Sequence, residues 1–184
     1  AGSEIETGGT YKMHNRASEL VMYEPRPEQR DDYELSLYNH IMASVAEDSP
    51  ANTYHVPLRP ASVKQFGNPH LNGFTCCNGT AIESSTKLQH AIYFKSIDND
   101  DLYVNLFIPS TLNWSERNIR IEQETDFPKK DHTKLTVRGK GKFAIHLRVP
   151  SWATKGAQVK INGRTQNIKA EAGSYVKLSE NWKD

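Results

Sequence analysis

The spacing of apolar residues changes near residue 95 of this 184-residue chain. Before that point, apolar residues recur at the spacing of an amphipathic helix. After it, they alternate with polar residues, as in a strand with one buried face. The pattern predicts an α+β chain with two domains, a helical one over residues 1–95 and a β-sheet one over residues 96–184.

Three helices are predicted in the first domain. One covers residues 10–23, and its apolar positions form a single broad face. The residues of that face are Met13, Ala17, Leu20 and Val21. A second helix begins at Pro27 and extends to about Ala46, and its apolar residues cover more than one face, which predicts burial on several sides. The third helix covers residues 80–93.

The chain between the second and third helices, residues 48–75, has no regular apolar spacing. It contains many turn-forming residues: Pro50, Pro57, Pro60, Gly67, Pro69 and Gly73. A loop of this length is uncommon inside a compact domain and is often functional. We therefore expect a functional site to draw on it.

Short strands are predicted in the second domain. The alternating segments are residues 102–108, 119–121, 135–137, 143–149 and 175–178. Asn162-Gly163, directly after Ile161, is a strong hairpin signal. Short strands separated by polar turns favour an antiparallel β-sandwich.

Composition narrows the classes of partner. The 23 Lys and Arg residues nearly balance the 22 Asp and Glu residues, so no net field attracts nucleic acid or an anionic membrane. No apolar run approaches the roughly 20 residues that span a bilayer. No secretory signal opens the chain, although its first residues do not resemble a natural start, and periplasmic, secreted and cytoplasmic locations all stay open. A homo-oligomer also stays open.

Composition also bears on completeness. The hydrophobic fraction of 36% is low for a chain that buries its own core. The last residues, 181–184, read as the middle of a turn, where a sandwich would continue into another strand. We therefore expect the chain to be part of a larger protein.

The sharpest chemical feature is a pair of adjacent cysteines, Cys76 and Cys77, which are the two cysteines of the chain. Neighbouring residues do not meet the geometry of a disulfide. The pair is either two small side chains that fill space before a helix, or a metal-ligand pair or nucleophile acting as thiolate. The N-terminus of the predicted third helix would favour the thiolate form. A protein that uses the thiol pair alone for metal or redox chemistry is a third interpretation, but the spacing of a structural zinc site is absent.

Other polar residues are weaker candidates. Five histidines lie in the first half: His14, His40, His55, His70 and His90. None pairs with another at a helical spacing of four, and packing or surface histidines are commoner than ligands. Glu34 lies among apolar helix residues, so it is either buried with a partner or solvated. Tyr54 and His55 in the long loop could line a sugar-sized cleft, or Tyr54 could pack beneath the loop.

Four segments together resemble one enzyme family. They are ETGGTYKM (residues 6–13), DYELSLYNHIMAS (32–44), GFTCCNGTAIESSTKLQHAIYF (73–94) and LYVNLFIPSTLNW (102–114). In this order they resemble the β-L-arabinofuranosidases of glycoside hydrolase families 127 and 146, once catalogued as a domain of unknown function, with the closer likeness to bacterial members of family 146. The likeness covers nearly the whole chain.

The resemblance implies a fold and a reaction. The fold is an (α/α)6 barrel followed by a β-sandwich, of which this chain would hold the last barrel helices and most of the first sandwich. The reaction is the hydrolysis of β-L-arabinofuranosides of plant glycans, with net retention, through a thioglycosyl enzyme formed on a cysteine. A zinc ion is the implied cofactor, and a carbohydrate is the implied partner.

The resemblance also assigns residues. Cys76 matches the nucleophile, and Glu6, Cys76 and Cys77 match zinc ligands. Glu34 and Tyr54 match residues that bind substrate.

Two departures from the family pattern accompany these assignments. The third cysteine ligand falls at Gly8, which has no side chain, so zinc would have one ligand fewer than four. The general acid/base of the family lies upstream of Glu6, before this chain begins, so we expect the 184 residues alone to be inactive. The alternative function is a divergent carbohydrate-binding relative without zinc.

Overall fold

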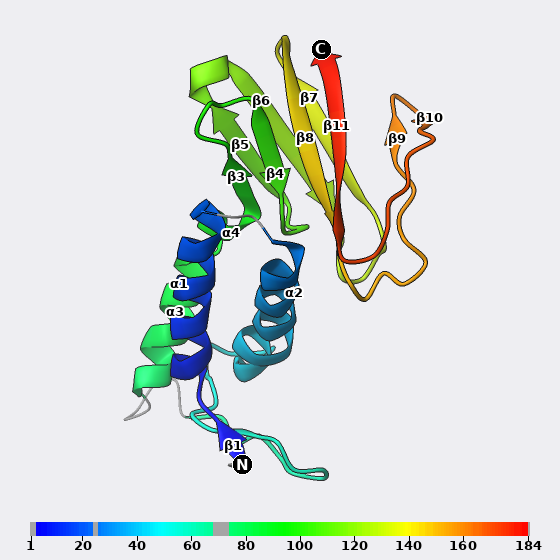
Figure 1. The fold of residues 1–184 in the computed structure, drawn as a ribbon. Helices are drawn as coiled ribbons and strands as arrows, with labels where there is room; N and C mark the ends of the chain where they lie inside the picture. Colours follow the sequence, from blue (N-terminus) through cyan, green and yellow to red (C-terminus); the bar gives the residue numbers. More distant parts are fainter. Residues whose placement is uncertain (1–2, 24–25, 68–73, 184) are drawn as a thin grey trace. The chain divides into compact units, whose positions relative to one another are not determined.

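The computed structural model describes residues 3–23, 26–67 and 74–183, except the side chains of residues 21 and 22. It divides into two units, Ala1–Leu88 and Gln89–Asp184 (Figure 1). The predicted domains, 1–95 and 96–184, stay a prediction. The predicted loop residues Pro69 and Gly73, the histidine candidate His70 and the side chain of Val21 lie outside the described residues.

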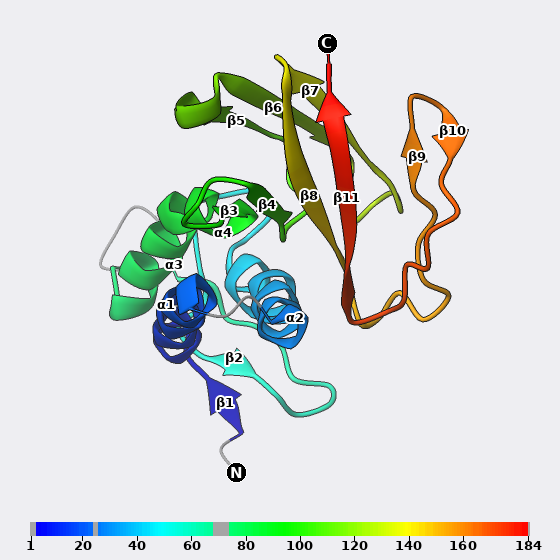
Figure 2. The ribbon, with the colours of Figure 1, turned by 45° about the horizontal axis from the view of Figure 1, so that its top comes forward.

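The first unit is helical, with one small strand pair. Its elements are β1 (Glu4–Ile5), α1 (Thr7–Tyr23), α2 (Pro27–Ser36), the π-helical turn η1 (Leu37–Ile41), the 3-10 turn η2 (Met42–Ser44), β2 (Val56–Pro57) and α3 (Cys76–Lys87). Helices α1 and α3 lie side by side in both views (Figures 1 and 2). No described helix combines the length and the apolar character that a membrane crossing requires.

Two predicted helix boundaries are wrong. Helix α1 begins at Thr7 rather than at residue 10, because the Thr7 hydroxyl bonds to the Thr80 hydroxyl of α3 at 2.8 Å and holds the first turn, although glycines at positions 8 and 9 favour the helix poorly. Helix α3 begins at Cys76 rather than at residue 80. The cysteines therefore lie inside the first turn of α3.

The predicted burial of the helices is also partly wrong. Met13 and Leu20 of the expected α1 face are 69% and 55% exposed. Tyr33, Leu37 and Ile41 are buried, as a single helix face would be. Of the other apolar residues in that segment, Leu35 and Met42 are exposed and Tyr38 is half-buried, so within the described residues it is not buried on several sides.

Polar side chains take the place of apolar ones between α1 and α2. His14 stacks on Tyr33 with ring centroids 4.0 Å apart, and its Nε2 lies 2.6 Å from Ser36 Oγ. Burial, together with the smaller effects of the charges of Arg30 and His40, lowers the pKa of His14 from 6.5 to about 4. The two helices therefore meet through a buried polar layer in which His14 is neutral.

The second unit consists mainly of β-strands. It opens with the short helix α4 (Gln89–Ile92) and continues with β3 (Tyr93–Lys95), β4 (Asp101–Val104), β5 (Ser110–Trp114), the 3-10 turn η3 (Ser115–Arg117), β6 (Ile119–Thr125), β7 (Thr133–Arg138), β8 (Gly141–Val149), β9 (Lys160–Ile161), β10 (Arg164–Thr165) and β11 (Ser174–Trp182). The predicted third helix therefore ends early, and Tyr93 belongs to a strand. Residues 181 and 182 belong to β11 rather than to a turn.

The strands form two larger sheets, ordered β11-β8-β4-β3 and β5-β6-β7. The predicted antiparallel arrangement is wrong at one pair, because β4 and β8 run parallel. Parallel strands need a crossover connection, and the chain that contains β5, β6 and β7 makes this connection between β4 and β8. The predicted hairpin is confirmed: β9 pairs with β10, and Asn162 and Gly163 between them have φ of 48° and 78°, as a type I′ turn requires.

One apolar cluster joins the two sheets. It contains Leu102 and Val104 of β4, Trp114 of β5, Ile119 and Ile121 of β6, and Phe143 and Ile145 of β8. Phe143 and Ile145 of β8 face this cluster as expected, but Ala144 and Arg148 of the same strand are buried too, so burial along β8 does not alternate strictly. Burial of apolar side chains is therefore the main stabilising contribution in this unit.

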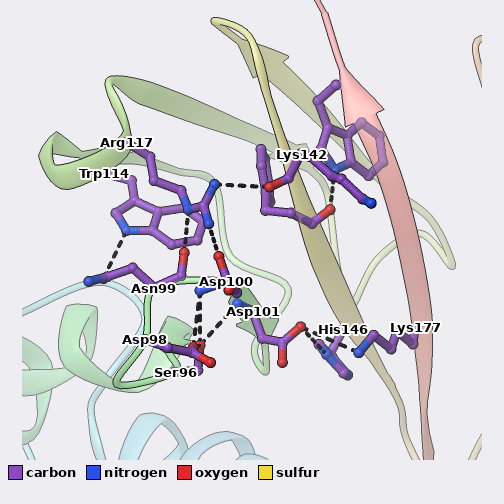
Figure 3. Close-up of polar contacts among 12 residues, drawn as sticks. Ser96, Asp98, Asn99, Asp100, Asp101, Trp114, Arg117, Lys142, His146 and Lys177 are labelled. Atoms are coloured by element: carbon purple, nitrogen blue, oxygen red, sulfur yellow. Dashed lines mark hydrogen bonds and ion pairs between the residues drawn. The ribbon is translucent and has the colours of Figure 1, made fainter.

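Polar contacts tie the turn between β3 and β4 to the rest of the sheet unit (Figure 3). The guanidinium of Arg117 pairs with Asp100, and it donates to the backbone oxygens of Asn99 and Lys142. Asp101 lies 3.2 Å from His146 Nε2 and 3.6 Å from Lys177 Nζ. These contacts join β4, β8 and β11, and they involve none of the predicted site residues.

Candidate functional site

A short antiparallel ladder positions the first part of the site. Strand β1 pairs with β2 in the register Glu4↔Pro57 and Ile5↔Val56 (Figure 2). Glu6 directly follows β1 and precedes α1. The ladder therefore fixes Glu6 at the point where the chain turns into α1.

The first turn of α3 positions the second part. Thr75 is the N-cap residue, with the extended backbone typical of that position. Its N–H donates to Asn78 Oδ1 at 2.7 Å, and its hydroxyl donates to the same oxygen at 2.9 Å. Cys76 and Cys77 follow as the first two helical residues. Both are free thiols, Cys76 exposed and Cys77 with no exposed surface.

These two parts come together at one place. The ligand atoms of Glu6, Cys76 and Cys77 all lie within 4.8 Å of one another, and they are the group of metal-binding side chains found among the described residues. Thr7 holds α1 to α3 beside them, through its bonds to Thr80 Oγ1 at 2.8 Å and to Cys77 O at 3.4 Å. No pattern in the sequence predicts this contact of Thr7.

Tyr54 also lies at the thiols. It is 39% exposed, so it does not pack beneath the loop. Its hydrogen bond with Cys76 raises the pKa of the Tyr54 phenol above its ordinary value, and negative charge on Cys76 and Glu6 raises it further. Tyr54 therefore keeps its proton and can donate it in a hydrogen bond to a Cys76 thiolate.

The remaining sequence candidates lie elsewhere or outside the cluster. Glu34 is only 3% exposed, in α2, and it is not a member of the metal-binding group. His14 and His40 are buried, and His40 bonds to Thr10 at 2.6 Å. His90 is exposed on α4. His55 is nearer, with its Nδ1 3.9 Å from Glu6 Oε1 and 3.7 Å from Glu4 Oε2.

The three clustered side chains fit zinc in kind and in spacing. Zinc binds thiolates and carboxylates, and bonds of about 2.0–2.3 Å place tetrahedral ligand atoms about 3.3–3.8 Å apart. A mutual distance of at most 4.8 Å is brought into that range by small side-chain rotations. Gly8 offers no fourth ligand, and a Cβ built there would meet only Thr80 Cγ2 at 4.0 Å.

Two surface hollows lie in the sheet unit and include no residue of this cluster. One, of about 420 Å³, is lined by residues such as Asp98, Glu116 and Arg117. The other, of about 510 Å³, has Asn113, Arg120 and Arg138 in its lining. Neither brings a nucleophile together with a metal-binding group, so the thiol cluster is the better candidate for chemistry.

Comparison with known proteins covers both units. The family description "Beta-L-arabinofuranosidase, GH127 catalytic domain" matches residues 1–90. "Beta-L-arabinofuranosidase, GH127 middle domain" matches residues 101–184. Comparison with curated proteins gives no significant match.

Solved structures match almost the entire chain. A GH127 β-L-arabinofuranosidase from Geobacillus stearothermophilus T6 is 25% identical, with a TM-score of 0.81, and the match covers 98% of this chain and 30% of that one. A GH127 β-arabinofuranosidase is 24% identical, with a TM-score of 0.80 and coverage of 98% and 31%. A further glycoside hydrolase is 21% identical, with the same TM-score and coverage. The chain thus spans about a third of the length of these structures.

The predicted family is therefore confirmed for family 127, whereas the closer likeness to family 146 stays a prediction. The two family descriptions match the helical and sheet parts in order, and a mixed α and β fold of that family covers 98% of the chain. The chain belongs to the GH127 family of β-L-arabinofuranosidases.

Proposed function

We propose that this chain is part of a retaining glycosidase that hydrolyses β-L-arabinofuranosides of plant glycans, with Cys76 as its nucleophile. The observation that carries the proposal is the cluster of Glu6, Cys76 and Cys77 within 4.8 Å, inside the segment that matches the catalytic domain of the family. An exposed thiol in the first turn of a helix, beside a hydrogen-bond donor, is suited to act as a nucleophilic thiolate.

The reaction proceeds by two displacements. The Cys76 thiolate attacks the anomeric carbon, an S–C bond forms, and the glycosidic C–O bond breaks while a general acid protonates the leaving oxygen. Water then attacks the same carbon, the S–C bond breaks, and the water proton passes to the conjugate base. Two inversions give net retention. The family resemblance puts the acid/base upstream of Glu6, so we expect residues 1–184 alone not to turn over substrate.

Glu6, Cys76 and Cys77 would hold the zinc ion, and Glu34 and Tyr54 would contact the substrate. Zinc, when bound, would keep its cysteine ligands deprotonated. Before substrate binds, the Tyr54 hydroxyl would donate a hydrogen bond to the Cys76 thiolate. The exposed ring of Tyr54 would stack against the sugar of the substrate. Cys77, which has no exposed surface, holds its position behind the nucleophile.

The proposal extends to the fold of the parent protein. We propose that α1, α2 and α3 are the last helices of an (α/α)6 barrel and that the two larger sheets form a β-sandwich. The support is the helical character of the first unit and the apolar cluster that joins both sheets of the second. The sheet unit then serves as packing rather than chemistry.

A second function, carbohydrate binding without hydrolysis, is favoured by Gly8, because this residue has no side chain that could bind the metal. A carbohydrate-binding relative without zinc would keep Glu34 and Tyr54 for binding and lose hydrolysis. Zinc analysis of the full-length protein, together with titration by an arabinofuranoside, separates the two functions. Sugar binding without zinc and without hydrolysis would favour the binding relative.

The direct test uses the full-length protein and an aryl β-L-arabinofuranoside. We expect Cys76→Ala to reduce kcat by at least about 10³-fold, because the nucleophile opens the covalent route. Ser85→Ala, on an exposed position of the same helix, is the matched control and should retain the wild-type rate. Equal rates for Cys76→Ala and the wild type would contradict the assignment.

A further inference from the structure

The β1–β2 ladder places one more potential ligand beside the cluster. Its register pairs Glu4 with Pro57 and Ile5 with Val56. One step further along the same register, Glu6 stands opposite His55. Side chains directly opposite in an antiparallel pair lie within contact distance, which agrees with the 3.9 Å between His55 Nδ1 and Glu6 Oε1.

The orientation of the imidazole supports a role as ligand. Nδ1 is the ring nitrogen that faces Glu6, and a neutral imidazole binds zinc through either ring nitrogen. The distance of 3.9 Å is close to the separation of about 3.3–3.8 Å between two ligand atoms of a tetrahedral zinc. The His55 backbone is also fixed, since its carbonyl accepts a bond from Thr53 Oγ1 at 3.1 Å.

Gly8 and Tyr54, which are also close to the cluster, do not occupy the fourth ligand position. Gly8 in the first turn of α1 has no side chain. Tyr54 is engaged with Cys76, and its ring meets the His55 ring edge-on at 4.0 Å. His55 Nδ1 also lies 3.7 Å from Glu4 Oε2. His55 is not one of the side chains whose ligand atoms lie within 4.8 Å of one another, so its imidazole would have to rotate about its side-chain bonds to reach a metal held by the other three.

We propose that His55 is the fourth ligand of the zinc site, which it forms with Glu6, Cys76 and Cys77. This inference rests on the proposed metal site of the glycosidase. Two thiolates, a carboxylate and a neutral imidazole around Zn²⁺ leave one net negative charge. A third thiolate in place of the imidazole would leave two. The ligand set with His55 therefore carries less negative charge around the attacking Cys76 sulfur than a set with three thiolates would.

The test measures zinc binding rather than activity, so its failure is distinguishable from failure of the glycosidase proposal. The full-length protein is loaded with zinc, and zinc affinity is measured by competition with a chromophoric chelator. We expect His55→Ala to weaken zinc binding by more than about 100-fold, because loss of an outer-shell partner alone costs about 10–100-fold. His90→Ala, which removes an exposed histidine of the sheet unit, is the matched control.

X-ray absorption at the zinc edge then identifies the ligands. The wild type should show two sulfurs at about 2.3 Å and two lighter ligands at about 2.0–2.1 Å, with imidazole scattering that His55→Ala removes. The double variant Gly8→Cys/His55→Ala should regain affinity and show three sulfurs, because space for a Cβ exists at Gly8.

Three results would overturn the inference. One is a His55→Ala protein with wild-type affinity and unchanged imidazole scattering. Another is a loss of affinity in His55→Ala that Glu4→Gln reproduces in full, which would mean that His55 acts only as the ion-pair partner of Glu4. The third is a wild-type spectrum that contains no imidazole.

Discussion

The two units of the chain bury different kinds of side chain. In the sheet unit the interior is an apolar cluster of aromatic and aliphatic residues between two sheets. In the helical unit many buried side chains are polar or charged: Thr7, His14, Arg30, Glu34, His40, Ser44, Asn52, Thr53 and Ser84. An apolar core tolerates exchanges between hydrophobic side chains of similar volume, whereas each buried polar group needs a hydrogen-bond partner. The helical unit, which contains the thiol cluster, therefore depends more on specific polar partners than the sheet unit does.

The largest expected effect comes from the apolar side of this comparison. Trp114 is 2% exposed, meets Phe143 with ring centroids 5.3 Å apart, and donates from Nε1 to Asn99 Oδ1 at 3.3 Å. We expect Trp114→Ala to lower the free energy of unfolding of the full-length protein by about 3–5 kcal/mol. Denaturant unfolding measures the change.

Trp152 provides the control for that variant. It is 55% exposed and stacks on Phe127, so Trp152→Ala should change the free energy of unfolding by less than about 1 kcal/mol. If the two tryptophan variants lose equal stability, the sheet unit does not depend on its apolar cluster as described.

The next effect is a pH dependence of the polar side. Burial holds the pKa of His14 at about 4 in the folded protein, against 6.5 when it is solvated. Between these pH values the unfolded chain therefore binds more protons at His14 than the folded protein does. The contribution of neutral His14 to the free energy of unfolding is fully present above pH 6.5 and is lost as the pH falls through 4. The loss amounts to about 3 kcal/mol.

Thermal unfolding of the full-length protein and of His14→Gln between pH 7.5 and 4 measures this contribution, over a window chosen to span roughly both pKa values. The amide keeps a polar partner for Ser36 and does not titrate. We expect the variant to be less stable at neutral pH and to show a shallower decline in acid. Parallel declines for the two proteins would exclude His14 as the cause.

The smallest effect concerns the start of α3. Thr75 caps the helix and fixes Asn78 through its N–H and hydroxyl. Thr75→Ala should lower the free energy of unfolding by about 1 kcal/mol and reduce kcat, because Cys76 is the next residue. Thr86→Ala, an exposed threonine near the end of α3, should leave kcat unchanged. A stability loss in Thr75→Ala without any change in kcat would separate the cap from the catalytic site.

Parts of the fold could be predicted because one physical signal dominates them. The two-residue alternation of 143–149 predicts β8, and Asn162-Gly163 predicts the β9–β10 turn, since the positive φ values there suit these residues. The apolar spacing does not predict strand β5, because only Leu112 and Trp114 among Ser110 to Trp114 are apolar, too few to set an alternation. The parallel pairing of β4 with β8 depends on the whole topology, which local patterns do not contain.

The candidate site was less accessible to sequence reasoning. The residue types of Cys76 and Cys77 indicate their chemistry. Their position inside α3 depends on the capping pair Thr75 and Asn78, which the spacing of apolar residues does not predict. Nothing in the sequence pairs two-residue strands such as β1 and β2 over fifty residues of chain, and that pairing puts His55 opposite Glu6. The family resemblance supplied the roles of Glu34 and Tyr54, which stay proposals.

The central claim is that Cys76 forms a covalent bond with the sugar. Its most direct test is mass spectrometry of the full-length protein, acid-quenched during turnover of an activated aryl β-L-arabinofuranoside. We expect the peptide containing Cys76 to gain the mass of one pentosyl residue, on the Cys76 sulfur, and the Cys76→Ala protein to gain none. A pentosyl group on Glu6 or Glu34, with Cys76 unmodified, would contradict the account.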